Sequence, residues 1–315
     1  MKVLVTGGAG FIANQLILTL VAEGHEVTTV DSMTDYYDLT LKEARLARLP
    51  ESVVVQRVDI TDREAMEQIY QTGKFDAVCH LAAQAGVRYS LECPDVYVQS
   101  NYVGTFTIFE LAKQFNVPHV VFASTSSVYG TSPDLPFTET DPVTTPMSIY
   151  AATKRGCELM AANYNHLYDL NVTCLRFFTV YGPWGRPDMA LFKFTKNMLA
   201  GEPIDVYNNG DMKRDFTYID DIVSGFSLAL KKPMGHEIIN LGNGKPVALT
   251  EFITCLEAEL GITAQQNLMP MQPGDVYETF ADTTKAKTLL GYEPKTDVAE
   301  GIHNFVSWYR EYYVV

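Results

Sequence analysis

Short apolar runs alternate with longer amphipathic segments over the first 180 residues. Runs rich in β-branched residues predict strands at 2–6, 26–30, 53–59, 77–83, 119–125 and 171–178, and a later run at 237–242 predicts one more. Between them, apolar positions with a helical period predict helices at 11–24, 94–116 and 148–169. Apolar strands that alternate with helices indicate a parallel sheet covered on both faces, in an α/β fold of the doubly wound Rossmann type.

The pattern changes after residue 178. Gly, Pro, Asn and Arg surround one amphipathic stretch, MALFKFTKNMLAG, and a helix is predicted at 217–230. We predict two domains with the chain crossing between them more than once. Residues 1–178 and 217–242 would form the domain that contains the large parallel sheet, and residues 179–216 and 243–315 a smaller α/β domain.

Composition narrows the function. Hydrophobic residues make up 47% of the 315 positions, enough for a buried core, and the net charge of -14 disfavours nucleic acids and anionic membranes as partners. The five cysteines form no CxxC or Cys/His cluster, so we expect reduced thiols in a cytoplasmic protein and no metal site. The first residues do not resemble a signal peptide, and no apolar run is long enough to span a membrane.

A glycine loop, VTGGAGFIA, connects the first strand to the first helix. Gly7 permits a tight turn, Gly10 lets the backbone approach a pyrophosphate, and the small Ala13 suits helix–strand packing. Asp31 ends the second strand, where a carboxylate accepts hydrogen bonds from the adenosine ribose and repels the extra phosphate of NADP. The pattern therefore predicts NAD, although Lys42 and Arg45 downstream could weaken that preference.

Other residues at strand ends fit a cofactor cleft, because ligands of such folds bind at the carboxyl ends of the strands. Taken singly, each of them is more often structural than functional. The candidates beside the glycine loop and the strand ends are Phe11, Ile12, Asp59, Ile60, Leu81, Ala82, Ala83, Gln84 and Asn101.

Tyr150 and Lys154 lie four residues apart on the predicted helix 148–169, hence on one face. A nearby ammonium lowers the pKa of a tyrosine, which can then take a proton from a substrate alcohol. The hydroxyl run at Thr125, Ser126 and Ser127 closes a strand and would lie across the same pocket. An ordinary amphipathic helix face is the alternative, which the glycine loop and hydroxyl run make less favourable.

These motifs together resemble the extended short-chain dehydrogenase/reductase family. The resemblance spans the chain through TGGAGFI, LAAQ, YxxxK, RFFTVYGP, RDFTYIDD and QPGD. It implies an enzyme that acts on nucleotide sugars, keeps NAD bound and uses Tyr150 as a base, with Lys154, Thr125 and Ser126 in the catalytic group. Dehydratases of the family carry an Asp-Glu pair in the hydroxyl run and decarboxylases a Glu at the place of Ser127. The absence of an acid here favours an epimerase.

Within the family, the chain is most similar to the UDP-glucuronate 4-epimerases. The stretches that carry this likeness are DYYDLTLKEARLARL, AGVRYSLE, MQPGDV and the long segment 177–222. The likeness implies a homodimer formed through the helices at 94–116 and 148–169. It also implies substrate contacts: Ser127 near the sugar, Arg88 and Arg214 at the diphosphate, Tyr207, Asn208 and Asp275 at the uridine, and Thr179 and Arg186 at the sugar carboxylate.

Arginines in Gly/Pro-rich loops of an acidic protein support an anionic substrate independently, because a guanidinium makes forked contacts to phosphate and carboxylate. We therefore expect conversion of UDP-glucuronic acid to UDP-galacturonic acid through a transient 4-keto sugar. The alternatives are a 4-epimerase for UDP-glucose or UDP-N-acetylhexosamine and, less favoured, a UDP-glucuronate decarboxylase. A non-catalytic NAD-sensing protein on the same fold is a further alternative, disfavoured by the intact Tyr150 and Lys154.

Overall fold

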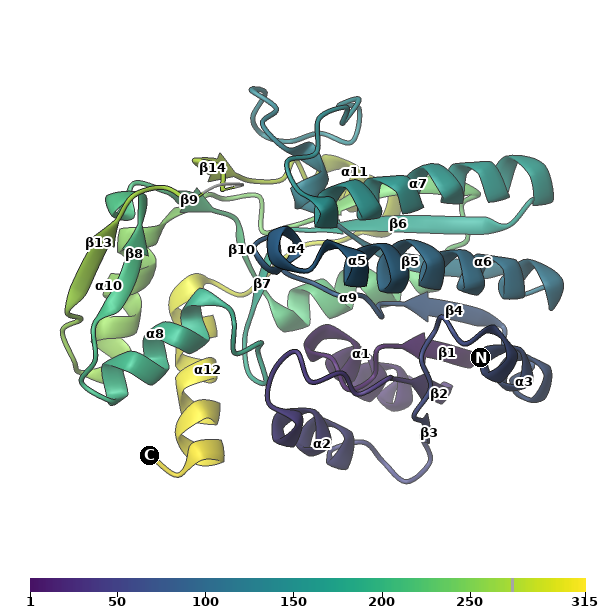
Figure 1. Cartoon of the computed structure of the whole chain (residues 1–315), viewed down its shortest axis with the longest axis horizontal. Helices are drawn as coiled ribbons and strands as arrows, with labels where there is room; N and C mark the ends of the chain where they lie inside the picture. The colour runs from purple at the N-terminus through teal and green to yellow at the C-terminus, as the bar shows by residue number, and fades with distance from the viewer. Residues whose placement is uncertain (273–274) are drawn as a thin grey trace.

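The computed structural model describes residues 1–272 and 275–315. Its centre is a parallel sheet that has seven strands in this described part (Figure 1). The spatial order places β1 between β4 and β2 and reverses there, as in a Rossmann fold. This order confirms the predicted fold class: β3 (Val54–Gln56), β2 (Glu26–Val30), β1 (Lys2–Thr6), β4 (Ala77–His80), β5 (His119–Thr125), β6 (Asn171–Phe177) and β11 (His236–Leu241).

Both faces of the sheet are buried, as the apolar strands require. Val3 and Val5 belong to one hydrophobic core, whereas Leu4 between them belongs to another. The first core packs under α1 (Phe11–Ala22), α9 (Ile219–Leu230) and α11 (Thr284–Leu290), with α2 (Leu39–Ala47) beside α1. The opposite face is covered by α3 (Arg63–Gly73), α5 (Pro94–Tyr97), η1 (Val98–Val103), α6 (Gly104–Gln114) and α7 (Ile149–Tyr168).

Small sheets and the helices that flank them form the part at the left of Figure 1, past the carboxyl ends of the large sheet. Strand β8 (Ile204–Tyr207) pairs with β13 (Gln266–Met269), β7 (Thr179–Tyr181) with β10 (Phe216–Tyr218), and β9 (Lys213–Arg214) with both β12 (Val247–Ala248) and β14 (Glu278–Thr279). The helices there are α8 (Ala190–Leu199), α10 (Leu249–Leu260) and α12 (Val298–Tyr313). Short turns complete the chain: α4 (Tyr89–Glu92), η2 (Ser126–Tyr129) and η3 (Asn208–Gly210).

Several predicted elements differ in extent from those observed, among them the strand expected at 77–83, which ends at His80. The strand expected at 53–59 is regular only over Val54–Gln56, because β3 lies at the sheet edge and its side chains are exposed. The helix expected from residue 217 begins at Ile219, because Phe216–Tyr218 pair as a strand with Thr179–Tyr181. Pairing across the sheet overrides local preference at the last two places.

The helix that carries Tyr150 has a well-defined start. Ser148 has extended backbone angles, and its Oγ accepts a hydrogen bond of 3.1 Å from the N–H of Ala151. Such an N-cap satisfies one of the free N–H groups at a helix start. The cap therefore places Tyr150 in the first turn of α7, directly beside the end of β5. None of the helices in the described residues is long and apolar enough to cross a membrane.

Candidate active site

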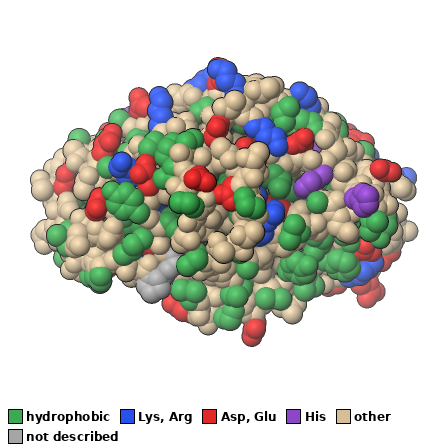
Figure 2. All heavy atoms as spheres, turned by 90° about the horizontal axis from the view of Figure 1, so that it is seen from above, with side chains coloured by type: hydrophobic (Ala, Val, Ile, Leu, Met, Phe, Trp, Pro, Cys, Tyr) green, Lys and Arg blue, Asp and Glu red, His purple; other side chains and the backbone are tan. Residues whose placement is uncertain are grey.

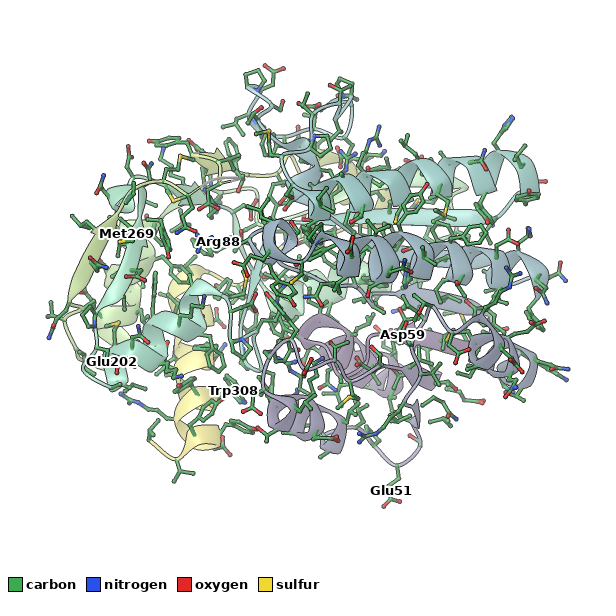
Figure 3. All side chains as sticks on the ribbon, in the orientation of Figure 1. Glu51, Asp59, Arg88, Glu202, Met269 and Trp308 are labelled. Carbon is green, nitrogen blue, oxygen red and sulfur yellow. The ribbon has the colours of Figure 1, made fainter. Side chains whose placement is uncertain are left out.

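A cavity of about 700 Å³ lies beyond the carboxyl ends of the central strands, between the large sheet and the smaller sheets. Figure 3 shows Asp59 on the large-sheet side and Arg88 close to the smaller sheets. Residues from segments far apart in sequence line this cavity. Those named as candidates above are Gly7, Gly10, Phe11, Ile12, Asp31, Asp59, Ile60, Leu81, Ala82, Ala83, Gln84, Arg88, Thr125, Ser126, Ser127, Tyr150, Lys154, Thr179, Arg186, Tyr207, Arg214 and Asp275.

The glycine loop has the close packing that a dinucleotide site needs. Gly7 has a φ of +83°, and a Cβ there would stand 2.9 Å from the backbone of Ala82. A Cβ on Gly10 would stand 2.9 Å from the carbonyl oxygen of Gly7, at the position where a phosphate meets the N-terminus of α1. Only glycine satisfies both positions, so the loop leaves its backbone open to a bound pyrophosphate.

Asp31 lies at the end of β2 beside this loop. Its carboxylate accepts hydrogen bonds from the backbone N–H of Ala9 at 3.0 Å and of Met33 at 2.8 Å. The carboxylate therefore has a defined orientation at the cavity wall, where a ribose hydroxyl can reach it. With the glycine loop, this arrangement fits the adenosine half of NAD.

Two basic residues near Asp31 differ in whether they can reach a bound cofactor. Arg45 is fully buried and its guanidinium is bonded to backbone carbonyls, so it is not free to bind a phosphate of NADP. Lys42 does line the cavity, and its Nζ donates to the carbonyl and hydroxyl oxygens of Thr34. Burial lowers the pKa of Lys42. Of the two, Lys42 alone remains placed to influence cofactor preference.

The catalytic candidates converge where β5 ends and α7 begins. The Nζ of Lys154 donates a 2.8 Å hydrogen bond to the carbonyl of Ala123, which ties α7 to β5. Thr125 caps η2, its Oγ1 accepting from the N–H of Ser127 at 3.1 Å and donating to the Ser127 hydroxyl at 3.2 Å. The hydroxyl run and the Tyr–Lys pair thus face one pocket.

The pKa values differ from expectation at Tyr150. Burial raises the pKa of this phenol, while the hydrogen bond with Thr125 and the positive charge of Arg186 act in the opposite direction. Burial therefore outweighs the lowering of the Tyr150 pKa that we expected from the neighbouring lysine. Burial also lowers the pKa of Lys154 to about 8. Its ammonium is thus close to neutralisation at mildly alkaline pH.

Four residues from distant segments meet at the other end of the cavity. The Nη2 of Arg88 lies 3.1 Å from Oδ2 of Asp275, and its guanidinium stacks 4.3 Å from the ring centre of Tyr207. Arg214 is held by hydrogen bonds to the carbonyls of Lys213 and Tyr277. Burial lowers the pKa of Arg214 despite the negative charge of Asp275. This end presents two guanidinium groups and one aromatic ring to a ligand.

Arg186 lies between the two ends. Its Nε and Nη2 bond the carboxylate of Asp188, which also accepts a hydrogen bond from the Tyr36 hydroxyl at 3.2 Å. Thr179 lines the same region, and its N–H donates to the carbonyl of Asp215. Because the charge of Arg186 acts on Tyr150, a cation is placed close to the reacting group.

Two candidates do not line the cavity. Asn101 is buried behind it, with its side chain paired to the backbone N–H and carbonyl of Gln84 at 2.8 and 3.0 Å. It fixes the backbone of Gln84 in the loop that follows β4. Asn208 turns away, and its amide donates to the carbonyl of Asp211. These positions do not support a direct contact with a ligand for either Asn101 or Asn208.

The cavity also contains polar residues that the sequence reasoning missed: Tyr36, Asp188, Lys193 and Asn197. Tyr36 belongs to the DYYDLT stretch and Asp188 to PWGRPD, so both lie in segments already singled out. Lys193 and Asn197 lie four residues apart on α8 and therefore on one face. This spacing of four residues is the feature of the sequence that could have identified Lys193 and Asn197 as cavity residues. Among the described residues, no group of three or more His, Cys, Asp or Glu is arranged to hold a metal ion.

A family model described as the NAD dependent epimerase/dehydratase family matches residues 3–242. The chain belongs to this family, which confirms the predicted relationship and is consistent with the fit of the glycine loop and Asp31 to NAD. The match covers the large sheet through β11, hence the whole part of the chain that carries the glycine loop and the Tyr–Lys pair.

Individual relatives point the same way. A UDP-glucuronate 4-epimerase of Thermodesulfobacterium geofontis is 48% identical over 98% of this chain and 96% of its own length. A crystal structure of UDP-glucuronic acid 4-epimerase from Bacillus cereus, with UDP-glucuronic acid and NAD, has a TM-score of 0.93 and 34% identity, covering 99% and 100% of the two chains. A UDP-glucose 4-epimerase from Thermotoga maritima, with UDP-glucose, has a TM-score of 0.92 and 31% identity, covering 99% and 100%.

Proposed function

We propose that this protein is an NAD-dependent epimerase that interconverts UDP-glucuronic acid and UDP-galacturonic acid by inversion at C4 of the sugar. The observation that carries the proposal is the convergence of Tyr150 with Arg186 in a cavity that begins at the glycine loop. The full-length similarity to UDP-glucuronate 4-epimerases supports the same reaction.

The chain supplies the proton chemistry and the binding. NAD, held at the glycine loop and Asp31, would supply reversible hydride transfer at C4. Tyr150 takes the proton of the C4 hydroxyl and gives it back, and the neighbouring hydroxyls of Thr125 and Ser126 bind the reacting oxygen. Lys154 holds α7 against β5 and contributes positive charge. Turning the 4-keto sugar within the cavity exposes its other face, which inverts C4.

A uronate places its carboxylate on the carbon next to C4. A cation for that carboxylate must therefore lie near Tyr150, which is where Arg186 lies. Asp188 bonds Nε and Nη2 of Arg186, and in the part of the chain described here Nη1 makes no hydrogen bond. Thr179 and this free edge can hold the carboxylate so that its bond to C5 does not align with the ketone, which restrains loss of CO2.

The alternative with specific support is a 4-epimerase for a neutral UDP-hexose. The Thermotoga maritima enzyme with UDP-glucose has nearly the same fold, so the backbone alone does not discriminate between the two sugars. What separates them is the carboxylate pocket around Arg186. We infer the uronate because the edge of the Arg186 guanidinium that Asp188 leaves open lies near the reacting group and can bind a carboxylate, which a neutral sugar lacks.

The decisive experiment adds UDP-glucuronic acid to purified protein without added NAD and follows the products by NMR. We expect UDP-galacturonic acid, with no CO2 and no net formation of NADH. A UDP-pentose product would instead establish a decarboxylase. No reaction with the uronate, together with turnover of UDP-glucose, would overturn the proposal in favour of the neutral sugar.

The two parts of the chain bind different ligands. Residues 1–178 and 217–242, which contain the seven strands of the large sheet, bind NAD, and residues 179–216 and 243–315 bind the nucleotide sugar. This division does not require that either part bind its ligand as an isolated fragment. Strand β10 spans the boundary at residues 216 and 217 and pairs with β7. The five cysteines are free thiols, which fits work in the cytoplasm.

The protein forms a homodimer through the helical segment 94–116, which contains η1 and α6, and through α7. Figure 2 shows hydrophobic side chains gathered toward its lower right edge, over the outer side of these helices. Tyr102, Phe106 and Leu159 are exposed there, and Gly156 has no side chain to separate Tyr102 from α7. Exposed apolar patches of this kind mark interaction sites, and self-association of one patch gives a two-fold dimer.

A charge in this surface tests the dimer. Leu159→Glu should convert the dimer to monomer in light scattering, because the carboxylate would be desolvated at the interface. Leu268→Glu on β13 is the matched control, since Leu268 and Leu159 are 57% and 56% exposed. A wild-type protein that is monomeric at micromolar concentration would contradict the dimer.

A further inference from the structure

Arg45 on α2 is a buried arginine with an unusual set of partners. It is 0% exposed, and within the described part of the chain its guanidinium bonds only main-chain carbonyls and one phenol. Nε and Nη2 donate to the carbonyl of Trp184 at 3.1 and 2.7 Å, and Nη2 donates to that of Gly185 at 3.1 Å. Nη1 donates to the carbonyl of Ala9 and the hydroxyl of Tyr37. One side chain thus connects the glycine loop to the segment before Arg186.

The backbone that Arg45 holds is strained. Trp184 has a φ of +62°, a region that side chains other than glycine rarely adopt, in a turn where the N–H of Gly185 donates to the carbonyl of Gly182. Such a conformation persists only where its surroundings determine it. The Trp184 ring contacts two further side chains. The Cζ of Arg48 lies 4.5 Å from the centre of this ring, and the ring centre of Trp308 on α12, labelled in Figure 3, lies 5.2 Å from it.

A second contact reaches Arg186 from the other side. The hydroxyl of Tyr36, in the loop before α2, donates to Asp188 at 3.2 Å, and Asp188 holds two nitrogens of Arg186. Segment 36–45 therefore restrains Arg186 in two ways. Arg45 binds the main chain that precedes Arg186, and Tyr36 binds the Asp188 carboxylate that orients the Arg186 guanidinium.

We infer that Arg45 and Tyr36 are positioning residues that set sugar selectivity: they fix Arg186 in the orientation in which it receives the carboxylate of the substrate. This inference rests on the proposed function. The two residues belong to the segment that follows the cofactor-binding strand β2, so that segment serves the sugar as well as NAD. Neither residue needs to touch the substrate for this role.

A purely structural role for Arg45 makes a different prediction. Loss of general stability would weaken every UDP-sugar alike, whereas misplacement of Arg186 weakens only a ligand that has a carboxylate. The ratio of the dissociation constants for UDP-glucuronic acid and UDP-glucose separates the two roles, because the nucleotide and most of the sugar are common to both ligands.

The experiment measures both dissociation constants by calorimetry on the NAD-loaded protein. Arg45→Lys keeps the charge but cannot fork across the carbonyls of Trp184 and Gly185. We expect it to weaken UDP-glucuronic acid about ten- to a hundredfold relative to UDP-glucose, the range for a small misplacement of a positioned group. Arg48→Lys is the matched control, since Arg48 contacts the Trp184 ring and not these carbonyls. It should leave the ratio unchanged.

Equal weakening of both ligands by Arg45→Lys, or an unchanged ratio, would overturn the inference. If this variant does not fold, Tyr36→Phe decides, since it removes one hydroxyl: a smaller shift of the ratio in the same direction is expected, and no shift overturns the inference. A wild-type protein that does not epimerise UDP-glucuronic acid would refute the proposed function itself. An active wild type with unchanged selectivity in the variants would refute only this inference.

Discussion

Replacing Glu158 by Gln should destabilise the protein strongly, although the two side chains have nearly the same shape. Glu158 lies on α7 one turn beyond Lys154, and its side chain is fully buried. Its carboxylate accepts hydrogen bonds from Ser124 Oγ at 2.6 Å, from Arg176 Nε and Nη2 at 2.9 and 2.8 Å, and from Arg155 Nη1 at 3.0 Å. It thereby joins α7 to β5 and β6.

The size of the effect follows from the unpaired charge that remains in the variant. Arg176 is 1% exposed, and without the carboxylate its charge would be buried with no counterion. Breaking a buried ion pair by removing one partner costs about 3–5 kcal/mol. The glutamine amide adds a further mismatch, because its NH2 group would face guanidinium donors. We expect a loss of this size and a fall in melting temperature of about 5–8 °C.

The assay is chemical denaturation of the wild type and variants, all loaded with NAD. Arg155→Gln is a suitable control: Arg155 contacts the same carboxylate but is partly exposed, so its loss should cost about 1 kcal/mol or less. The double variant Glu158→Leu with Arg176→Met should recover much of the stability lost by Glu158→Gln, since no charge remains buried.

Acid should reduce the difference between wild type and Glu158→Gln. Burial raises the pKa of the Glu158 carboxyl, but the hydrogen bonds and charge of Arg176, with Ser124 and Arg155, outweigh it and hold the pKa below the usual 4.5. A lowered carboxyl pKa stabilises the fold above pH 4.5, and that contribution disappears as the pH falls through the lowered value. A loss below about 1 kcal/mol at neutral pH would refute the reasoning.

Three further predictions concern the reaction. Tyr150→Phe should lower kcat by at least about a hundredfold with little change in the affinity for UDP-glucuronic acid, since it removes only the proton-transferring group; a kcat near that of the wild type would exclude Tyr150 as the base. Because burial lowers the pKa of Lys154 to about 8, kcat/KM should fall as the pH rises above that value, and Lys42→Met should retain this alkaline limb. Asp31→Ala should weaken NAD about tenfold or more, since hydrogen bonds to a charged group contribute about 1.5–3 kcal/mol; NAD retained at wild-type level after gel filtration would argue against the ribose contact.

Several features could be predicted from sequence alone because they depend on neighbours along the chain. The apolar runs at 2–6, 26–30 and 119–125 coincide with β1, β2 and β5. The glycine loop follows from turn and packing requirements that act over ten residues. Tyr150 and Lys154 share a face because a helix of 3.6 residues per turn brings positions four apart together. Strand ends were less certain, as β3 shows, because pairing depends on the neighbouring strand.

Contacts across long separations were decided only by the tertiary structure. Arg88 and Asp275 are 187 positions apart, and Arg45 and Trp184 are 139 apart, yet each pair is in direct contact. The family resemblance implied only that Arg88 and Asp275 both contact the substrate, at the diphosphate and at the uridine, and periodicity, composition and spacing indicate neither contact. The same holds for the pKa of Tyr150, which burial raises although a lysine lies one turn away. The sequence thus determined the elements and their chemistry through local geometry, whereas packing determined which side chains face one another and how far each is removed from water.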